Sequence, residues 1–482
     1  MSDLAGFLGI GLALAVLVVL AYRGWSVLLL APVTALIAAG FSGFPLLATL
    51  TQLFMTGAAG FIAQFFPLFL FGALFAKLMN DSGSVSTIAD CMTRVLGRER
   101  AVLAVVLAGA VLTYGGISLF VAFFVMVPMA QALFDGAGIP RRLVPATVIL
   151  GTSTFTMTAL PGSPAIQNVI PMPFFGTSLY SAPGLGFIAA AVMLAIGLAW
   201  LRRAQAVARR NGEGEAIACP IDAARIREHS TTASTFDPAE IDRGAPAADR
   251  PGFAVAFVPV GVVICVNLLL SLVVLPSIDA DYLAEAKWGG TTVSAVAGIW
   301  SVVAALAVAT LVLILLNRGR LTNLRDSVDA GCHAAVLPAL SVASLVGFGA
   351  VIAALPAFEA IRDWLLGLGG GPLVSLAVAT NLLAGLTGSA SGGLTIALEA
   401  LGPAYMDIAA RTGTDPELMH RVAVIGAGTL DLLPHNGAVV TLLALCGMTH
   451  RESYIDIAVA GILNSLVALI VVILVASVFG SF

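Results

Sequence analysis

Long apolar runs alternate with short polar connections along most of this sequence. A helix that crosses a bilayer needs about 20 consecutive, predominantly apolar residues. Runs of that kind predict spanning helices over residues 4–22, 26–45, 60–78, 184–201, 252–276, 291–316, 333–355 and 454–480. The pattern therefore predicts an all-α chain that crosses a membrane several times.

Two further apolar regions are interrupted near their middle by small residues. Region 101–134 contains Gly115-Gly116, and region 372–408 contains the stretch from Ser389 to Gly393. Each region is long enough to enter the membrane and return, so each predicts a re-entrant helical hairpin with its tip at these small residues.

Two other apolar regions are interrupted by polar residues and a proline. They cover residues 143–176 and 418–447, with the interruptions around Pro161 and Pro434. Non-helical backbone at membrane depth is tolerated only inside protein or beside a water-filled cavity. These regions therefore predict two broken transmembrane helices whose broken parts face the protein interior.

The interruptions recur in the same order in the two halves of the chain. Residues 112–168 and 386–440 each begin with Leu-Thr, pass a proline and a polar link, and reach Leu-Pro near the end. The offset between the two copies stays at about 274 residues. We interpret the two stretches as an internal duplication.

The arginines assign the copies to opposite orientations. Basic residues of membrane proteins concentrate on the cytoplasmic side, and they flank region 101–134 at positions 94–100 and 141–142. With both flanks inside, the tip at residues 113–118 is reached from the cytoplasm. The counterpart hairpin then opens outside, which gives the inverted-topology repeats of secondary transporters.

Three sections follow from this plan. Residues 1–203 form the first inverted repeat, residues 204–250 a cytoplasmic polar linker, and residues 251–482 the second inverted repeat. The linker is rich in Ser, Thr, Ala, Pro and charge, which is typical of a partly disordered connection. A plain tether and a regulatory segment both remain open as its role.

Composition supports the membrane assignment and limits the chemistry. Of 482 residues, 59% are hydrophobic and only 10% are charged, whereas soluble proteins carry about 25% charged residues. The five cysteines form no CxxC pair and no cluster with histidine, so no metal is expected. No phosphate loop, dinucleotide fingerprint or ATPase motif occurs, so we expect no cofactor, no ATP hydrolysis and no nucleic-acid partner. The first apolar run lacks a basic region and a cleavage site, which predicts an uncleaved helix.

Four interrupted segments should meet near the middle of the membrane and form a site for an anion. Each break exposes helix N-termini, whose free N–H groups attract negative charge. Glycine permits close backbone approach and serine supplies a hydroxyl donor. The predicted substrate-binding residues are Gly115, Gly116, Ser118, Thr152, Ser153, Thr154, Ser163, Gln167, Asn168, Ser389, Ser391, Gly392, Gly393, His435 and Asn436.

Two acids lie within these apolar segments and are candidates for proton coupling. A charge at the centre of a membrane helix costs roughly 2.5–3.5 kcal/mol on the insertion scale, so such residues usually serve a function. Asp431 is either a protonatable coupling site or a carboxylate that caps a helix at the break. Glu399 is a second candidate, and His435 is a candidate relay or hydrogen-bonding residue.

Two motifs resemble a known family. LPGSPAIQNVIPMPFFGTSLYSAPGLG at residues 160–186 and LPHNGAVVTLLALCGMTHRESYIDI at residues 433–457 are similar to the gluconate permease family of bacterial H+ symporters, within it to the hydroxybutyrate-permease branch. The proline- and histidine-rich first motif of the gluconate members is replaced here by Leu-Pro-Gly-Ser-Pro.

The resemblance implies a small monocarboxylate substrate, proton coupling and the fold of the ion transporter superfamily. That fold has a scaffold domain and a moving transport domain, usually in a homodimer. The implied location is the bacterial inner membrane, with many passes through the lipid bilayer.

Other activities remain open at this point. Gluconate or another sugar acid is an alternative substrate, and Na+ is an alternative coupling ion. A passive channel is a further class. Ser389-Ala390-Ser391-Gly392 with His435 resembles the nucleophile and base of an intramembrane serine protease. The partner copy, Gly115-Gly116-Ile117-Ser118, has no histidine, and a protease needs no inverted second copy, so we do not expect an enzyme.

Overall fold

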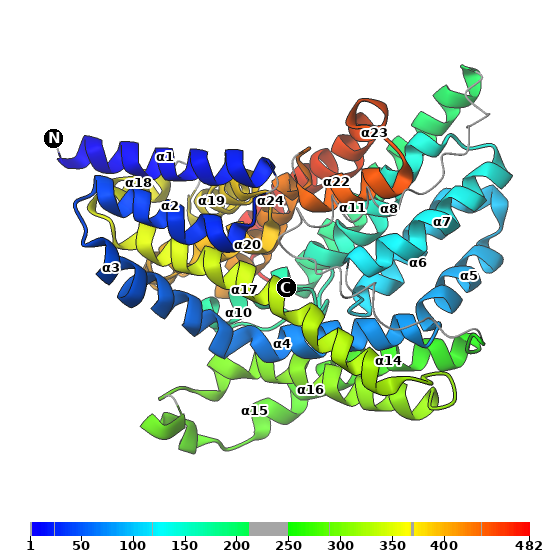
Figure 1. Cartoon of the computed structure of the whole chain (residues 1–482), viewed down its shortest axis with the longest axis horizontal. Helices are drawn as coiled ribbons and strands as arrows, with labels where there is room; N and C mark the ends of the chain where they lie inside the picture. Colours follow the sequence, from blue (N-terminus) through cyan, green and yellow to red (C-terminus); the bar gives the residue numbers. More distant parts are fainter. Residues whose placement is uncertain are drawn as a thin grey trace.

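All regular secondary structure in the described part of the chain is helical. The computed structural model describes residues 2–23, 25–117, 119–211, 249–288, 290–367, 371–434 and 436–482. Figure 1 shows long helices along one side of the molecule and shorter, interrupted helices beside them. The all-α fold class predicted from the sequence is confirmed.

Each of the eight predicted spanning runs forms a helix. In chain order these helices are α1 (Ser2–Tyr22), α2 (Val27–Phe41), α4 (Met55–Asp81), α11 (Pro183–Arg210), α14 (Phe253–Leu269), α16 (Val293–Leu316), α17 (Leu324–Ala354) and α24 (Asn464–Phe479). Short helices lengthen three of them: α3 (Leu46–Ala48) with η1 (Thr49–Phe54) before α4, η5 (Leu270–Val274) with α15 (Leu275–Ser277) after α14, and α23 (His450–Ile457) with η9 (Ala458–Leu463) before α24. Within the described ranges six helices are long and apolar enough to cross a membrane, or seven when one bent pair counts as a span.

Both predicted hairpins are present. The first consists of α6 (Ala101–Tyr114) and α7 (Leu119–Ala137), and the second of α19 (Gly371–Thr387) and α20 (Ala390–Thr412). Gly116 and Gly388 have φ angles of 85° and 61° in the turns, a region that glycine adopts without strain. The second turn is tighter than predicted, because residues 391–393 already belong to the first turns of α20.

Both predicted broken helices are also present. The first runs through α8 (Val144–Thr152), the π-helical turn η4 (Phe155–Ala159), α9 (Ile166–Val169) and α10 (Pro171–Phe175). The second runs through α21 (Pro416–Thr429), the turn η8 (Leu430–Leu432) and α22 (Gly437–Cys446). The two arms of the second are bent by 48° relative to each other.

Some boundaries and elements differ from the prediction. Two amphipathic helices, α5 (Ser84–Leu96) and α18 (Pro356–Leu366), precede the hairpins and were not predicted. Their apolar and polar residues alternate, so neither helix contains the long apolar run on which the prediction was based. Helix α11 continues to Arg210, so the predicted linker begins with a helical extension rather than irregular chain. Residues 212–248, most of the predicted linker, lie outside the described ranges.

The long helices pack in a pattern that repeats between the two halves. Helices α4 and α17 pack against each other along their length. Around them α1 packs on α2 as α14 packs on α16, and α2 contacts α17 as α16 contacts α4. Likewise α5 contacts α14 and α18 contacts α1. We call α1, α2, α4, α14, α16 and α17 the scaffold.

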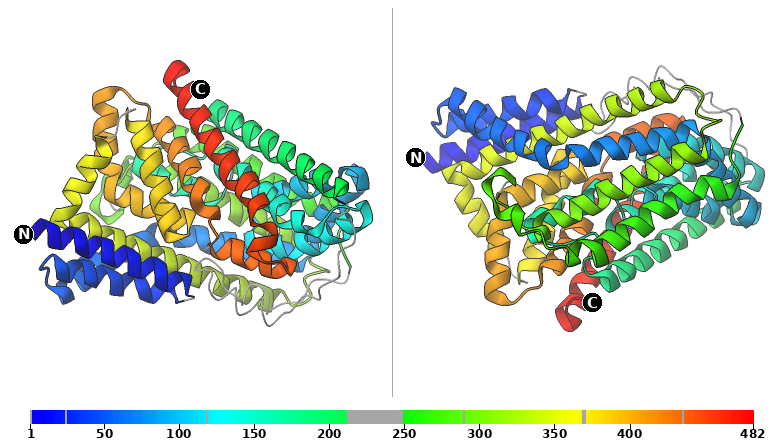
Figure 2. Two further views of the ribbon diagram at one scale, coloured as in Figure 1. Left: turned by 90° about the horizontal axis from the view of Figure 1, so that it is seen from above. Right: turned by 90° about the horizontal axis from the view of Figure 1, so that it is seen from below.

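The remaining helices repeat the pattern at the hairpins. Helix α6 packs on α8 as α19 packs on α21, and each second hairpin arm contacts the broken helix of the other half: α7 contacts α22, and α20 contacts α10. The last helices of the two halves, α11 and α24, lie side by side (Figure 2). We call the two hairpins, the two broken helices, α11 and α24 the transport domain.

Small residues allow the central scaffold helices to approach closely. A Cβ atom added at Gly347 of α17 would lie 2.7 Å from the carbonyl oxygen of Phe54, and one at Gly331 would lie 2.9 Å from the Cα of Leu74. Close backbone approach at glycine is a common basis of helix association in membranes. The α4–α17 contact is therefore expected to be rigid.

One basic residue lies elsewhere than its sequence position suggested. Lys77 lies near the end of the predicted spanning segment 60–78, where the positive-inside rule would place it at the cytoplasmic surface, but its side chain is only 1% exposed. Its Nζ lies 2.9 Å from Oδ1 of Asp81, and Oδ2 of Asp81 accepts a hydrogen bond from Ser327 Oγ on α17 at 2.7 Å. The residue is thus part of a buried ion pair within the scaffold.

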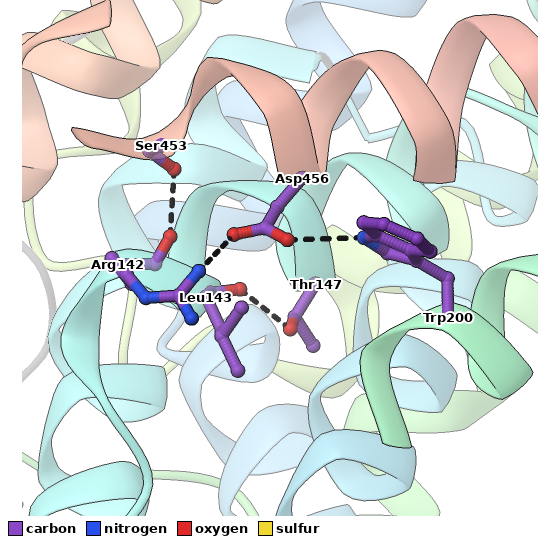
Figure 3. A network of polar contacts seen from close by, with 6 residues as sticks. All are labelled: Arg142, Leu143, Thr147, Trp200, Ser453 and Asp456. Carbon is purple, nitrogen blue, oxygen red and sulfur yellow. Dashed lines mark hydrogen bonds and ion pairs between the residues drawn. The ribbon is translucent and has the colours of Figure 1, made fainter. Parts of the chain in front are cut away.

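A second ion pair ties the transport domain together (Figure 3). Arg142 NH1, before α8, lies 2.6 Å from Oδ2 of Asp456 on α23, and Trp200 Nε1 on α11 donates to Oδ1 of the same carboxylate at 3.0 Å. Ser453 Oγ donates to the backbone oxygen of Arg142 at 2.7 Å. Three chain segments, far apart in sequence, are thereby joined at one carboxylate.

Candidate functional site

The tip of the second hairpin is bonded directly to the second break. Oδ1 of Asp431, in η8, accepts a hydrogen bond from the backbone N–H of Ala390 at 2.6 Å and another from Asn436 Nδ2 at 2.8 Å. Asn436 Nδ2 also donates to the carbonyl oxygen of Gly388 at 2.7 Å. Asp431 and Asn436 are both buried, so this polar junction is enclosed by protein.

Asp431 caps a helix, as one of the two readings of the sequence had it. Ala390 is the first residue of α20, and its N–H is one of the free donors at the start of a helix. A carboxylate at that position is also favoured by the partial positive charge of the helix N-terminus. The capped helix belongs to the hairpin rather than to the break itself, so the acid links the hairpin to the broken helix.

Asn436 serves the next helix in the same way. Its Oδ1 accepts from the N–H groups of Ala438 and Val439 at the start of α22, at 2.7 and 3.3 Å. Its amide therefore joins three elements: the hairpin turn, Asp431 and α22. We conclude that the predicted residue Asn436 belongs to the junction through both ends of its side chain.

The serines and glycines of the second tip shape the start of α20. Ser389 is its N-cap and accepts from Gly392 N at 3.2 Å, and its hydroxyl lies 3.3 Å from that of Ser391. A Cβ at Gly393 would lie 2.3 Å from Ala384 of α19, and one at Gly392 would lie 2.4 Å from Leu345 of α17. Both glycines are required for close packing of the hairpin.

The first hairpin tip makes a corresponding contact with the first break. Tyr114 Oη, at the end of α6, donates to the carbonyl oxygen of Pro161 at 2.6 Å. A Cβ at Gly116 would lie 3.4 Å from Pro164, and one at Gly115 would lie 2.9 Å from Val260 of α14. The first tip thus rests between the break and the scaffold, as the sequence predicted for a tip that meets a broken helix.

Two predicted hydroxyls of the first broken helix, those of Thr152 and Thr154, bond to their own backbone. Thr152 Oγ1 donates to the carbonyl oxygen of Val148 at 2.8 Å and lies 3.1 Å from Ser153 Oγ, while Thr154 Oγ1 donates to that of Leu150 at 2.7 Å. All three side chains are buried. The hydroxyl protons of Thr152 and Thr154 are therefore directed at the preceding helical turn in this conformation.

The residues after Pro161 behave differently from one another. Ser163 is fully buried, and within the described chain its Oγ has no hydrogen-bond partner. Asn168 donates to the carbonyl oxygen of Ser163 at 3.1 Å and is also fully buried. Gln167 is half-buried on the short helix α9. Of these three, Ser163 carries the free hydroxyl that a ligand would need.

Sequence reasoning missed Arg421, which lies behind this break. The side chain is 0% exposed on α21 and donates to Oδ1 of Asn168 at 3.3 Å. Its neighbour His420 is equally buried, with Nδ1 2.7 Å from Thr177 Oγ1. A signal was available, because both residues interrupt the apolar run 418–447 that was already assigned to the membrane.

The two breaks lie against each other. A Cβ at Gly428 of α21 would lie 2.4 Å from Thr158 of η4, and α20 and α21 both contact α9 and α10. The predicted meeting of the broken helices with the hairpin arms is therefore present. Glu399 is half-buried near the middle of α20, more than two helical turns from Ser389, and is not part of the Asp431 junction.

Two predicted site residues, Ser118 and His435, lie outside the described ranges. Among the described residues, no group of three His, Cys, Asp or Glu side chains is arranged to hold a metal ion.

The architecture and the buried polar junctions define the class of protein. Apolar spans around two helical hairpins and two interrupted helices form a multi-pass membrane transporter. No family model matches the sequence. The chain is 41% identical over 454 residues to the uncharacterized transporter YxjC of Bacillus subtilis (strain 168), covering 92% of this chain and 93% of that protein. It therefore belongs to the same transporter family.

A solved structure shares the fold. The YdaH transporter of Alcanivorax borkumensis, whose crystal structure revealed an unusual topology, superposes with a TM-score of 0.54 over 88% of each chain. The sequences are 16% identical, so this likeness concerns the fold alone.

Proposed function

We propose that the protein is a secondary active transporter that imports a small monocarboxylate together with protons. The proposed substrate is a hydroxy acid similar to 3-hydroxybutyrate. The observation that carries the proposal is the buried Asp431 carboxylate, which bonds the hairpin tip to the break. Among the described residues it has no ion-pair partner.

Asp431 is well placed to link protonation to motion. Proton binding changes its charge from −1 to 0 at an atom that accepts from both Ala390 and Asn436. A neutral acid is a weaker acceptor than a carboxylate, because charge-assisted hydrogen bonds are the stronger ones. Protonation of Asp431 would therefore weaken the hydrogen bonds that hold the hairpin tip. Such a difference in interaction energy between two states is what coupling requires.

A carboxylate substrate also favours the protonated form of Asp431. Two like charges in one enclosed site disfavour each other. Proton and anion would then bind cooperatively, and by reciprocity each strengthens the binding of the other. Cooperative binding of this kind is the basis of symport.

The proposed motion is of the elevator type. The transport domain would move as a unit against the scaffold, because the duplicated halves offer two similar packings related by a pseudo-two-fold axis. The Arg142–Asp456–Trp200 contacts support movement as a unit, since they lie within the transport domain. We further propose a homodimer in the bacterial inner membrane.

No catalytic activity is part of the proposal. Ser389, in the stretch that resembles a protease nucleophile motif, is the N-cap of α20 and accepts from Gly392 N. A structural role of this kind accounts for the residue without a nucleophile–base pair. Gluconate or another sugar acid is the second candidate substrate, and Na+ is the second candidate coupling ion, both favoured by the same resemblance to carboxylate symporters.

Uptake into proteoliposomes tests the proposal. Purified protein is supplied with labelled 3-hydroxybutyrate, gluconate and neutral solutes under separate H+ and Na+ gradients. We expect saturable accumulation of 3-hydroxybutyrate above equilibrium with an inward H+ gradient alone. Accumulation driven by Na+ alone would assign the other ion. Equilibration without accumulation would indicate a channel, and no carboxylate uptake under any gradient would contradict the proposal.

A further inference from the structure

Arg421 is a buried cation at the interface between the two broken helices. It lies on α21, its side chain is 0% exposed, and it faces the chain segment between η4 and α11. A guanidinium remains protonated at any physiological pH. The interior of the transport domain therefore holds a permanent positive charge.

Every N–H group of this guanidinium donates to a neutral oxygen. Nε donates to Ser181 O at 3.2 Å, and NH2 donates to Ser181 O at 2.7 Å and to Leu179 O at 3.5 Å. NH1 donates to Ala159 O at 3.2 Å and to Asn168 Oδ1 at 3.3 Å. The hydrogen bonds satisfy the donors, but none of the acceptors carries a negative charge.

The charge has no ion-pair partner among the described residues. Glu417, one helical turn earlier, is exposed, and its Oε2 accepts from the backbone N–H of Ala182 at 3.0 Å. The buried Lys77 of the scaffold, in contrast, has Asp81 as a direct partner at 2.9 Å. Buried charges are normally paired, so an anion bound from outside the chain would serve as the counter-ion of Arg421.

The side of Asn168 that faces away from Arg421 leads to an unused hydroxyl. Asn168 Nδ2 donates to the carbonyl oxygen of Ser163 at 3.1 Å, and Ser163 Oγ is buried with no partner in the described chain. A chain of two hydrogen bonds thus connects the cation to Ser163. The free hydroxyl can donate to a carboxylate oxygen, while the charge behind it stabilises that carboxylate through space.

We propose that Arg421 sets the anion specificity of the transport site. It positions Asn168 and the break around Ser163, and its charge, which has no direct ion-pair partner among the described residues, favours a carboxylate there over a neutral solute of the same shape. It acts through the break rather than by touching the substrate. This inference rests on the proposed function, because it concerns the carboxylate that the transporter carries.

Two substitutions separate charge from hydrogen bonding. Arg421→Gln removes the charge and part of the donor fork, whereas Arg421→Lys keeps the charge and loses the fork. Lys77→Gln is the matched control, because it removes an equally buried cation from the scaffold. The probes are 3-hydroxybutyrate and its neutral primary amide, 3-hydroxybutyramide, whose binding to purified full-length protein is measured at one pH and ionic strength.

We expect Arg421→Gln to weaken binding of 3-hydroxybutyrate by about tenfold to thirtyfold, the size of a unit-charge effect across roughly 8–12 Å at an effective dielectric constant of about 20. Binding of the amide should change less than threefold. Arg421→Lys should retain most of the preference for the anion, and Lys77→Gln all of it. Equal loss of both ligands in Arg421→Gln, or equal behaviour of the Lys and Gln variants, would assign Arg421 a structural role only and overturn the inference.

A second variant serves if Arg421→Gln does not fold. Asn168→Asp keeps the side-chain size and supplies Arg421 with an internal counter-ion. It should weaken binding of the anion by about tenfold or more and leave the amide unchanged, whereas unchanged anion binding would overturn the inference. If the wild type binds neither 3-hydroxybutyrate nor any other acid of the uptake panel, both the proposed function and this inference are wrong. A loss of anion binding that occurs only in the variants bears on the role of Arg421 and leaves the proposed function intact.

Discussion

Oδ1 of Asp431 lies 2.6 Å from the backbone nitrogen of Ala390, 41 residues earlier in the chain. The carboxylate of the second break is therefore the cap of the second hairpin's outgoing helix. A group that titrates at this position changes both the charge of the site and the hold on the hairpin, and the first two predictions follow from that double role.

Asp431→Asn should uncouple transport from the proton. The amide has the shape of the protonated acid and cannot titrate. We expect the variant to bind substrate and exchange it across the membrane, with an affinity that no longer varies with pH, whereas wild-type affinity should rise as pH falls. Counterflow and gradient-driven uptake in proteoliposomes measure the two activities. Accumulation at the wild-type level would remove Asp431 from the mechanism and leave Glu399 as the next candidate.

Asn436→Ala should loosen the second hairpin tip. The change removes donors to Gly388 O and Asp431 Oδ1 and the cap of α22. Loss of a hydrogen bond to a charged group typically costs about 1.5–3 kcal/mol, so substrate affinity should fall by roughly tenfold or more. Hydrogen exchange of residues 387–392 should increase in parallel. Unchanged exchange at this tip would contradict the assigned role of Asn436.

Ser391 and Ser163 should contribute differently to substrate binding, because their hydroxyl groups differ in their hydrogen-bond partners. Ser391→Ala and Ser163→Ala both remove a single hydroxyl, but Ser391 Oγ has Ser389 as a neighbour and Ser163 Oγ has no partner in the described chain. We expect Ser163→Ala to weaken substrate binding by roughly tenfold, as for a hydrogen bond to a charged group, with little change in thermal stability. Ser391→Ala should alter both affinity and stability modestly. Equal and unchanged affinities in both variants would move the substrate away from the second tip and the first break.

A cross-link between scaffold and transport domain should stop transport. A Cβ at Gly349 of α17 would lie 3.3 Å from the Cα of Ile396 on α20, so a Gly349→Cys, Ile396→Cys pair is within reach of a disulfide. We expect oxidation to abolish uptake and reduction to restore it, in a background that lacks the five native cysteines. Uninterrupted transport by the oxidised protein would exclude an elevator motion at this contact.

The neighbouring position on α17 supplies the control for this cross-link. A Cβ at Gly57 of α4 would lie 3.0 Å from Cβ of Ala350. A Gly57→Cys, Ala350→Cys pair joins two scaffold helices that are not expected to move relative to each other. Its oxidation should leave uptake intact.

The buried pair of the scaffold should contribute to stability and not to specificity. Lys77→Met leaves Asp81 charged and without its cation, which typically costs about 3–5 kcal/mol for a buried pair. Replacement of both residues, as Lys77→Met with Asp81→Leu, should recover much of the loss because no charge remains buried. Thermal unfolding of the two single variants and the double variant forms the cycle. Single variants as stable as the wild type would show that water reaches the pair.

The elements of the fold could be predicted largely because glycine and proline mark where apolar helices stop. Gly116, Gly388, Pro161 and Pro434 lie at or beside the observed interruptions. The amphipathic helices α5 and α18 also lie between such residues, Gly83 and Gly97 for α5 and Pro356 and Gly367 for α18, but they have few consecutive apolar residues. Their helical structure depends on packing against neighbours such as α14 and α1.

The contacts of the candidate site could not be predicted from the sequence. The rule that places basic residues outside the membrane does not hold for Arg421 and Lys77, both of which are buried, Arg421 with backbone and amide acceptors and Lys77 with the carboxylate of Asp81. Whether a hydroxyl faces a ligand or its own helix also depends on rotamers that sequence does not specify. Thr152 and Thr154 bond to the preceding turn, whereas Ser163, in irregular backbone, has no such acceptor.

The contrast between the two hairpin tips has a consequence for how the two halves of the protein would respond to protonation. At the first tip, Tyr114 donates to the Pro161 carbonyl, a bond between neutral groups. At the second, the corresponding contact includes the carboxylate of Asp431. Under the proposed coupling mechanism, protonation would therefore alter the contact at the second tip and leave the contact at the first tip unchanged. The gradients of proton and substrate set the direction of net transport, so this divergence would decide which of the two tips the bound proton releases, and not the direction of transport.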